Sequence, residues 1–352
     1  MGLILIVAAG RLWLAVGATE AADLRLTQIA PGIHEIRLPI PWEEEIVNCF
    51  LFSRGSQVDL LDCGIQTDQS VAAVLAAIEE VGGPGATLRR LVITHIHPDH
   101  FGAAGALKER TGVELFMHRL EVPMVHPRYL ELEQLVAEVG HNLRLNGVPE
   151  PDVSSLQNAS RAMREFVRPG EPDVQLDGAE TLELGGRRLR VEWTPGHSPG
   201  HICLFDLDDR LLFAGDQILP DISTNIALHP QSTPNPLGEF LESLDRLLAL
   251  EPALVLPAHG RPFVDAASRV ARLHAHHQRR LDQIEALLGE EEISGWEVAI
   301  RIWGERTNIW DKRMALQEGL AHLQLLAVQR RVTKLADTGG VRWRRSRAEP
   351  TG

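Results

Sequence analysis

The sequence has few cysteines and few lysines, and it lacks a long hydrophobic run. Its three cysteines, Cys49, Cys63 and Cys203, are isolated and form no CxxC pair. An odd number of separated cysteines argues against a disulfide framework and favours a reducing, cytoplasmic location. Lysine accounts for only three of the 35 basic residues, a bias that we attribute to base composition rather than to chemistry.

No segment predicts a membrane span. The first residues, Gly2 to Ala18, are apolar, but Arg11 interrupts them. They stay below the ~20 apolar residues that a spanning helix needs, and they lack the basic start and the cleavage site of a signal peptide. We therefore expect residues 1–23 to form an N-terminal extension, and we expect no membrane association.

The charge of the chain is unevenly divided. The net charge is −13, yet residues 1–265 carry 20 basic and 37 acidic side chains, whereas residues 266–352 carry 15 basic and 11 acidic ones. The larger part should therefore repel polyanions such as nucleic acids, and the C-terminal segment should not.

The order of apolar patterns predicts an α/β protein. Runs with a period of two residues, or short continuous apolar runs, predict strands, and runs with a period of 3.6 residues predict helices. The predicted strands cover 24–29, 32–39, 47–54, 57–62, 88–93, 113–117, 181–184, 188–193, 201–207, 211–214 and 253–256. The predicted helices between them cover 70–81, 101–110 and 237–250.

Two segments depart from this alternation. Residues 119–168 are mostly helical by pattern and predict a helical insertion, which is either a lid over a site or a plain packing subdomain. After Pro262 the pattern becomes helical again, with a long helix over 266–288 and a shorter one that Ser294 and Glu297 would cap. A hairpin is then expected around Gly339-Gly340. We interpret residues 266–352 as a small winged-helix-like domain.

The run Thr94-His95-Ile96-His97-Pro98-Asp99-His100 places three imidazoles and a carboxylate directly after a predicted strand. Such a cluster suits neither a core nor an ordinary loop, because protonated imidazoles repel one another and buried ones need partners. A shared divalent cation reconciles them, since it binds neutral imidazole nitrogens and carboxylate oxygens. We interpret the run as half of a two-metal hydrolytic site.

Three later clusters repeat the pattern of a polar ligand in a glycine- or proline-containing turn after a strand. They contain His197 and His201 in Thr194–His201, Asp216 after a strand that ends near 214, and His259 in Pro257–Gly260. Strand ends hold side chains rigidly, and glycine lets the backbone approach an ion closely. In this order, the clusters predict the other half of the site.

With these motifs, residues 24–265 resemble the metallo-β-lactamase-fold hydrolase superfamily. The resemblance implies a four-layer αββα sandwich, here with the helical insertion and the winged-helix-like domain added. Carried over by position, it implies a first metal held by His95, His97 and His197, a second held by Asp99, His100 and His259, and Asp216 as the bridge. It also implies that Asp62 supports the histidine loop from behind; the alternative for Asp62 is a turn carboxylate at a strand end.

The implied chemistry is hydrolysis by a metal-bridging hydroxide. Two metals about 3.5–4 Å apart can share a hydroxide and present it as a nucleophile near neutral pH. We name Asp99 and Asp216 as catalytic, since Asp99 could orient the hydroxide and Asp216 would fix the spacing of the metals. Nitrogen and oxygen ligands without a thiolate suit two Zn²⁺ ions, with Fe or Mn as alternatives.

Other polar residues are candidates for support or substrate contact. His201 is expected to start a strand in a structural role rather than to bind metal. His118 either contacts substrate at the rim of the site or is structural, and Tyr129, the only tyrosine, either donates to a substrate oxygen or packs. The tract His274–His277 is interpreted as a solvated helix face.

The motifs leave the substrate and the oligomeric state open. The preferred hypothesis is a glyoxalase II-like thioesterase acting on a small-molecule thioester or ester, because a thiolate leaves readily without a strong proton donor. A second is a lactamase-like endonuclease that binds single-stranded RNA through the tryptophans and arginines of 296–347, which the acidic larger part disfavours. A third is a mononuclear iron dioxygenase acting on persulfides, which shares the motifs.

Overall fold

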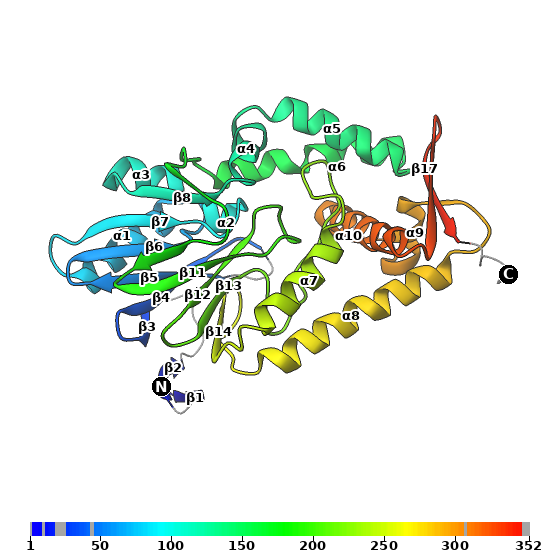
Figure 1. The fold of residues 1–352 in the computed structure, drawn as a ribbon. Helices are drawn as coiled ribbons and strands as arrows, with labels where there is room; N and C mark the ends of the chain where they lie inside the picture. The colour runs from blue at the N-terminus through cyan, green and yellow to red at the C-terminus, as the bar shows by residue number, and fades with distance from the viewer. Residues whose placement is uncertain (1, 9–10, 18–25, 43–45, 306–307, 347–352) are drawn as a thin grey trace.

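The computed structural model describes residues 2–8, 11–17, 26–42, 46–305 and 308–346. Within these residues, two large sheets pack face to face and helices cover their outer faces (Figure 1). This is the four-layer αββα sandwich that the sequence predicts. No helix in this described part combines the length and the apolar character that crossing a bilayer requires.

The first sheet has the strand order β3-β4-β5-β6-β7-β8-β9. Its strands are antiparallel from β3 to β6 and parallel from β6 to β9. The bounds are β3 (Leu26–Ala30), β4 (Ile33–Pro39), β5 (Ile46–Arg54), β6 (Gln57–Leu61), β7 (Thr87–Val92), β8 (Glu114–His118) and β9 (Val174–Leu176). The last strand was not expected from the sequence, because it has only three residues and one of them is exposed.

The second sheet has the order β10-β11-β12-β13-β14, with only the β13–β14 pair parallel. Its strands are β10 (Thr181–Leu184), β11 (Arg187–Trp193), β12 (Ile202–Asp206), β13 (Leu211–Gly215) and β14 (Leu254–Pro257). An apolar core fills the space between the two sheets, and Phe213 packs edge-on against both Phe50 and Phe52 there. This core fixes the relative position of the strand ends that carry the polar clusters.

Helices form the two outer layers. On the first sheet, α1 (Asp68–Gly82) contacts β4 to β7, and α3 (Ala104–Thr111) contacts β7 and β8. On the second sheet, α7 (Pro236–Leu248) and α8 (Ala266–Leu287) belong to the same apolar cluster as β12 to β14. The helix expected at 101–110 is observed as α3, and a separate short helix, α2 (Pro98–Phe101), precedes it and begins within the histidine run.

The segment between β8 and β9 is helical, as expected. It contains α4 (Val122–Val125), η1 (His126–Leu130), α5 (Leu132–Leu145), α6 (Glu150–Met163) and η2 (Arg164–Phe166). Helix α6 packs on the C-terminal helix α10 (Ile309–Val328), which also contacts α7 and α8. The insertion therefore reaches across the molecule to the C-terminal segment (Figure 1).

The C-terminal segment has the element order of a winged helix. After α8 come β15 (Ile293–Ser294), α9 (Gly295–Trp303), α10, β16 (Val332–Asp337) and β17 (Gly340–Arg345), and the three strands form one sheet. The capping box of Ser294 and Glu297 is present at the start of α9. At the other end of the chain, β1 (Gly2–Ala8) and β2 (Arg11–Gly17) form an antiparallel hairpin that was not expected. Residues 1, 9–10 and 18–23 of the predicted extension lie outside the described residues.

One expectation about α8 was wrong. His277 is buried rather than solvated, and its Nδ1 lies 3.2 Å from Nε2 of His322 on α10. His322 Nδ1 donates to the carbonyl of Glu318, so its Nε2 is free to accept from His277. Burial lowers the pKa of His277 to about 2 and that of His322 to about 4. The sequence did not reveal this because the covering helix lies 45 residues away.

These pKa values predict a loss of stability in mild acid. Both rings stay neutral in the folded state, while the unfolded chain takes up protons below about pH 6.5, so stability falls as pH drops below that value. Each ring should contribute a loss of about 2 kcal/mol between pH 7 and pH 5. In His277→Gln or His322→Gln, the free energy of unfolding from urea titrations should therefore fall by about 2 kcal/mol less over this interval. His141→Gln, which replaces an exposed histidine, should keep the wild-type pH dependence, and equal slopes in all four proteins would contradict the prediction.

Candidate metal centre

The polar clusters converge at one edge of the sandwich because each follows the end of a strand. Asp62 follows β6, the run His95–His100 follows β7, and Asp216 and His259 follow β13 and β14. The loop that carries His197 connects β11 to β12. Since β6 and β7 are parallel, as are β13 and β14, their carboxyl ends deliver these side chains to the same place.

Three histidines form the first group of candidate ligands. Nε2 of His197 lies 3.1 Å from Nε2 of His95 and 2.9 Å from Nδ1 of His97, and the last two atoms are 2.9 Å apart. Nitrogen ligands of tetrahedral zinc, each ~2.0–2.1 Å from the ion, lie about 3.3 Å from one another. The triangle of nitrogens thus has nearly the size that one cation requires.

Asp216 faces two groups of nitrogens with its two oxygens. Oδ2 lies 3.4 Å from His197 Nε2 and 4.0 Å from His95 Nε2. Oδ1 lies 3.4 Å from His100 Nε2 and 3.5 Å from His259 Nε2. A carboxylate placed between two ligand groups in this way has the geometry of a bridge.

Asp99 completes the second group. Its Oδ2 lies 3.2 Å from His259 Nε2 and 3.6 Å from His100 Nε2. The structure therefore brings together all seven residues that the resemblance nominates. Three ligand sets have atoms within 4.8 Å of one another: His95 with His97 and His197, His95 with His100 and Asp216, and Asp99 with His100 and His259.

Hydrogen bonds on the outer side fix the tautomers of three imidazoles. Nδ1 of His100 lies 2.8 Å from a carboxylate oxygen of Asp62. Nδ1 of His197 lies 3.0 Å from the carbonyl of Asn225, and Nδ1 of His259 lies 2.8 Å from the carbonyl of Ile46. Because these acceptors require a proton on Nδ1, Nε2 is in each ring the nitrogen that faces the centre and that could bind a metal.

The electrostatics of the two halves differ. Burial, together with the neighbouring imidazoles, lowers the pKa of His95 and His97 well below the usual value, which keeps these rings neutral. Burial also acts on His259, but Asp216 and Asp99 outweigh it and raise the pKa of His259 to about 9. The half that contains both carboxylates therefore attracts positive charge.

The donor set fits divalent cations. His100 Nε2 and Asp216 Oδ1 are buried and have no hydrogen-bond partner in the described part of the chain, although a buried polar atom without a partner is costly. The two atoms lie 3.4 Å apart, so one bound cation could interact with both. Nitrogen and carboxylate ligands at this spacing match zinc and related transition metals.

Asp62 holds the histidine loop from behind. Its Oδ1 accepts from the backbone N–H of Thr94 at 2.8 Å, and its Oδ2 accepts from Thr94 Oγ1 and from His100. Asp62 is 2% exposed and has a positive φ of 58°, a conformation that most residues avoid. Such a position agrees with the support role that the sequence suggests rather than with a surface turn.

His201 is buried and supports Asp216. Its Nε2 accepts from the backbone N–H of Asp216 at 3.1 Å, and its Nδ1 contacts Thr194 Oγ1 at 2.8 Å. Both ring nitrogens are thus used in the fold. This agrees with the structural role expected for His201.

Tyr129 and His118 are placed away from direct chemistry. The Tyr129 hydroxyl donates to the carbonyl of Ile96 at 2.7 Å, so it braces the histidine loop, although the ring also lines a cavity beside the site. His118 is buried and stacks on Trp193 with ring centroids 5.7 Å apart. It is not among the residues that line that cavity, so the rim position is not observed.

The sequence did not reveal two residues that hold the ligand loops in place. Glu121 is fully buried and accepts from the backbone N–H of Ile96 at 2.8 Å and of Gly200 at 2.6 Å, so it ties two histidine loops together. Asn48 donates to the carbonyls of Pro257 and Gly260 and so fixes the His259 turn. Their partners lie 25 to 212 residues away, and no local pattern marks such contacts.

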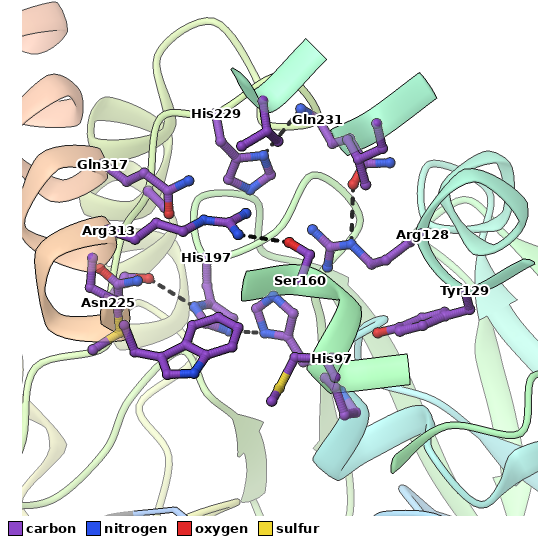
Figure 2. A pocket seen from close by; sticks show the side chains of 17 residues that line it. His97, Arg128, Tyr129, Ser160, His197, Asn225, His229, Gln231, Arg313 and Gln317 are labelled. Carbon is purple, nitrogen blue, oxygen red and sulfur yellow. Dashed lines mark hydrogen bonds between the residues drawn. The ribbon is translucent and has the colours of Figure 1, made fainter. Parts of the chain in front are cut away.

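A cavity of about 220 Å³ opens beside the three-histidine group. Figure 2 shows His97 and His197 at one side and the guanidinium groups of Arg128 and Arg313 directed into the same space. Its walls come from the helical insertion, from 225–231 and from α10. The insertion is therefore part of the wall of the candidate site as well as a packing element.

The chain is similar to proteins of one known family. The family model described as the metallo-beta-lactamase superfamily matches residues 42–259. The curated protein "Probable metallo-hydrolase YqjP" from Bacillus subtilis is 23% identical over 313 residues, which cover 85% of this chain and 93% of that protein.

Solved structures show the same similarity over most of the chain. A metallo-beta-lactamase family protein from Thermus thermophilus is 30% identical with a TM-score of 0.77, and the match covers 90% of this chain and 99% of that one. A beta-lactamase domain protein from Burkholderia ambifaria is also 30% identical, with a TM-score of 0.79 and coverage of 93% and 96%. The similarity therefore includes the C-terminal helical segment.

Glu121 gives a test of how the two histidine loops are held. In Glu121→Gln, one backbone N–H would face an amide NH₂ instead of an oxygen, so a buried donor loses its acceptor. We expect the free energy of unfolding to fall by about 2 kcal/mol or more, and bound metal per chain to fall with it. Denaturant titration and elemental analysis check both. Glu109→Gln, which removes an exposed partner of Arg168, should change stability by less than about 0.5 kcal/mol; equal behaviour of the two variants would contradict the role of Glu121.

Proposed function

The chain belongs to the metallo-beta-lactamase superfamily, and on this premise we propose that it is a hydrolase that binds two divalent cations and cleaves a small-molecule thioester or related ester. The observation that carries the proposal is the position of Asp216, whose two oxygens face two separate groups of imidazole nitrogens. The superfamily and its metallo-hydrolase relatives support metal-dependent hydrolysis in general.

The residues that would hold the cations follow from the contacts. His95, His97 and His197 would hold the first, and Asp99, His100 and His259 the second, with Asp216 shared between them. We propose Zn²⁺ for both positions. When bound, such a pair supplies a nucleophile derived from water at neutral pH and a Lewis acid for the scissile carbonyl.

The chain's own residues orient the reaction. The carboxylate of Asp99 lies beside His259 and His100, where it can accept a hydrogen bond from the attacking water and direct its lone pair. Asp62 and Glu121 keep the ligand loops in place. Preorganised ligands of this kind lower the barrier because little reorganisation remains when charge develops on the substrate oxygen.

A thioester suits this site because its leaving group needs little help. A thiol with a pKa near 8.5 departs as the thiolate without a strong proton donor. The wall beside the histidines is largely apolar, with Leu135, Val139, Met163 and Trp310 among its residues. Such a wall can accommodate an acyl chain. The three cysteines are free and buried, which supports our placement of the protein in the reducing cytoplasm.

Several of the residues nominated for RNA binding are engaged elsewhere. Trp343 is only 1% exposed, and Trp310 lines the cavity rather than an open surface. Arg331 pairs with Asp282 and Glu285, Arg342 pairs with Glu297, and Arg344 pairs with Glu292. A stacking platform with free cations, which single-strand binding needs, is therefore not offered by these side chains.

Asp216 provides the sharpest test of a two-metal centre. Asp216→Ala should reduce the metal content from two ions per chain to one or fewer, and kcat/KM should fall at least about a hundredfold, because both ion positions lose a ligand. Elemental analysis and steady-state kinetics measure the two effects. Asp245→Ala, which removes an exposed carboxylate, should leave both unchanged, and the model fails if Asp216→Ala retains two metals and full turnover.

A substrate panel tests the reaction class. The metal-loaded protein should hydrolyse S-acyl thioesters faster than a lactone, a β-lactam or single-stranded RNA, with Asp216→Ala as the blank for contaminating activity. Salt-sensitive cleavage of RNA without thioesterase activity would replace the proposal by an endonuclease. One iron per chain together with oxygen consumption on a persulfide would replace it by a dioxygenase.

A further inference from the structure

Two arginines line the cavity without a carboxylate partner among the residues that the structure describes. Arg128 belongs to η1, and its Nε donates to Gln231 Oε1 at 3.1 Å. Arg313 belongs to α10, and its Nη1 donates to Ser160 Oγ at 2.7 Å. These neutral partners orient the guanidinium groups, and no carboxylate of the described residues forms an ion pair with either one.

The two charges are close enough to affect one another. Both side chains are partly buried, and burial together with Arg128 lowers the pKa of Arg313 to about 10. Arg313 therefore stays protonated at neutral pH. Two like charges in one partly buried cavity are unfavourable unless an anion lies between them, and a guanidinium offers paired donors that match the oxygens of such an anion.

His229 adds a neutral donor to the same wall. Its Nδ1 accepts from the backbone N–H of Gln231 at 3.1 Å, so the ring proton lies on Nε2. Burial, Arg128 and Arg313 keep the pKa of His229 well below its usual value. The ring can therefore donate a hydrogen bond without adding a third charge.

The size of the cavity limits what can bind. Its volume of about 220 Å³ is below the ~300–1,000 Å³ typical of drug-sized ligands. The space suits a short chain with one anionic group, since apolar residues such as Leu135 and Met163 line it together with the arginines. His97 and His197 form its border with the metal centre (Figure 2).

We propose that this cavity is an anion-binding subsite for the substrate. In it, Arg128 and Arg313 bind a carboxylate or phosphate group of the ester, while the scissile carbonyl of the ester lies at the metal centre. The inference rests on the proposed hydrolase function, and it adds the class of substrate: a small ester or thioester that carries negative charge. The charge can reside on the acyl chain, as a terminal carboxylate, or on the leaving group, as a phosphate.

Matched thioesters distinguish these sources. The acyl arm compares glutaryl with pentanoyl thioesters of N-acetylcysteamine, which differ in the terminal carboxylate. The leaving-group arm compares the pentanoyl thioesters of 2-mercaptoethyl phosphate and 2-mercaptoethanol, which differ in the phosphate group. In the metal-loaded wild type, kcat/KM should favour the charged member of one pair.

The arginine variants then test the subsite. Arg128→Gln and Arg313→Gln should lower that preference about tenfold or more, because a charged donor to the anion is lost, and Arg313→Lys should lower it less. Arg301→Gln, an exposed arginine on α9, should leave the preference unchanged. A change in the acyl arm assigns a carboxylate, a change in the leaving-group arm assigns a phosphate, and unchanged preferences in both arms overturn the subsite.

Calorimetry separates the failure of the subsite from the failure of the hydrolase function. Glutarate and inorganic phosphate are titrated into the metal-loaded wild type, into both Gln variants and into Arg313→Lys, with metal content measured in each. Weaker binding of one anion to the Gln variants at equal metal content supports the subsite even when no thioester is hydrolysed. Equal affinities in all proteins, with hydrolysis intact, overturn the subsite and leave the hydrolase function standing.

Discussion

The crowding of lone pairs at one edge of the sandwich is the constraint on which the other features depend. His95, His97 and His197 bring three nitrogens to within 3.1 Å, and Asp216 places an oxygen on either side of the gap between this group and the next. Lone pairs at such distances repel unless a proton or a metal cation lies between them. The ligand atoms are held at these distances by strand ends, tight turns and buried carboxylates. The fold around the site therefore stabilises an arrangement that would otherwise be unfavourable.

Much of the frame could be predicted from the sequence, because its signals are local. The strands beside the core, the capping box at Ser294 and the clustering of the seven nominated residues all follow from short patterns, although the role of each as a ligand stays a proposal. What could not be predicted depends on distant partners. Glu121 joins loops 25 and 79 residues away, and His277 reads as a solvated residue until α10 covers it.

The candidate metal ligands and the other residues that line the cavity come from different parts of the fold. The residues nominated to hold cations come from strand ends of the two sheets, where the core between Phe50, Phe52 and Phe213 fixes their positions. The residues that would touch the rest of a substrate come from the insertion and from α10, as with Arg128 and Arg313. Helix α6 packs on α10, so the same contact joins the insertion to the C-terminal segment and forms part of the cavity wall.

The origin of that wall in α10 has an evolutionary consequence. The family match ends at residue 259, whereas Arg313 lies more than fifty positions later in the chain. Mutation in α10 can therefore reshape the cavity wall without disturbing any nominated ligand, so two homologues with identical histidine motifs can differ in this wall. For proteins with this fold, the histidine motifs indicate a metal centre, and the cavity residues of α10 have to be compared separately before a substrate is assigned.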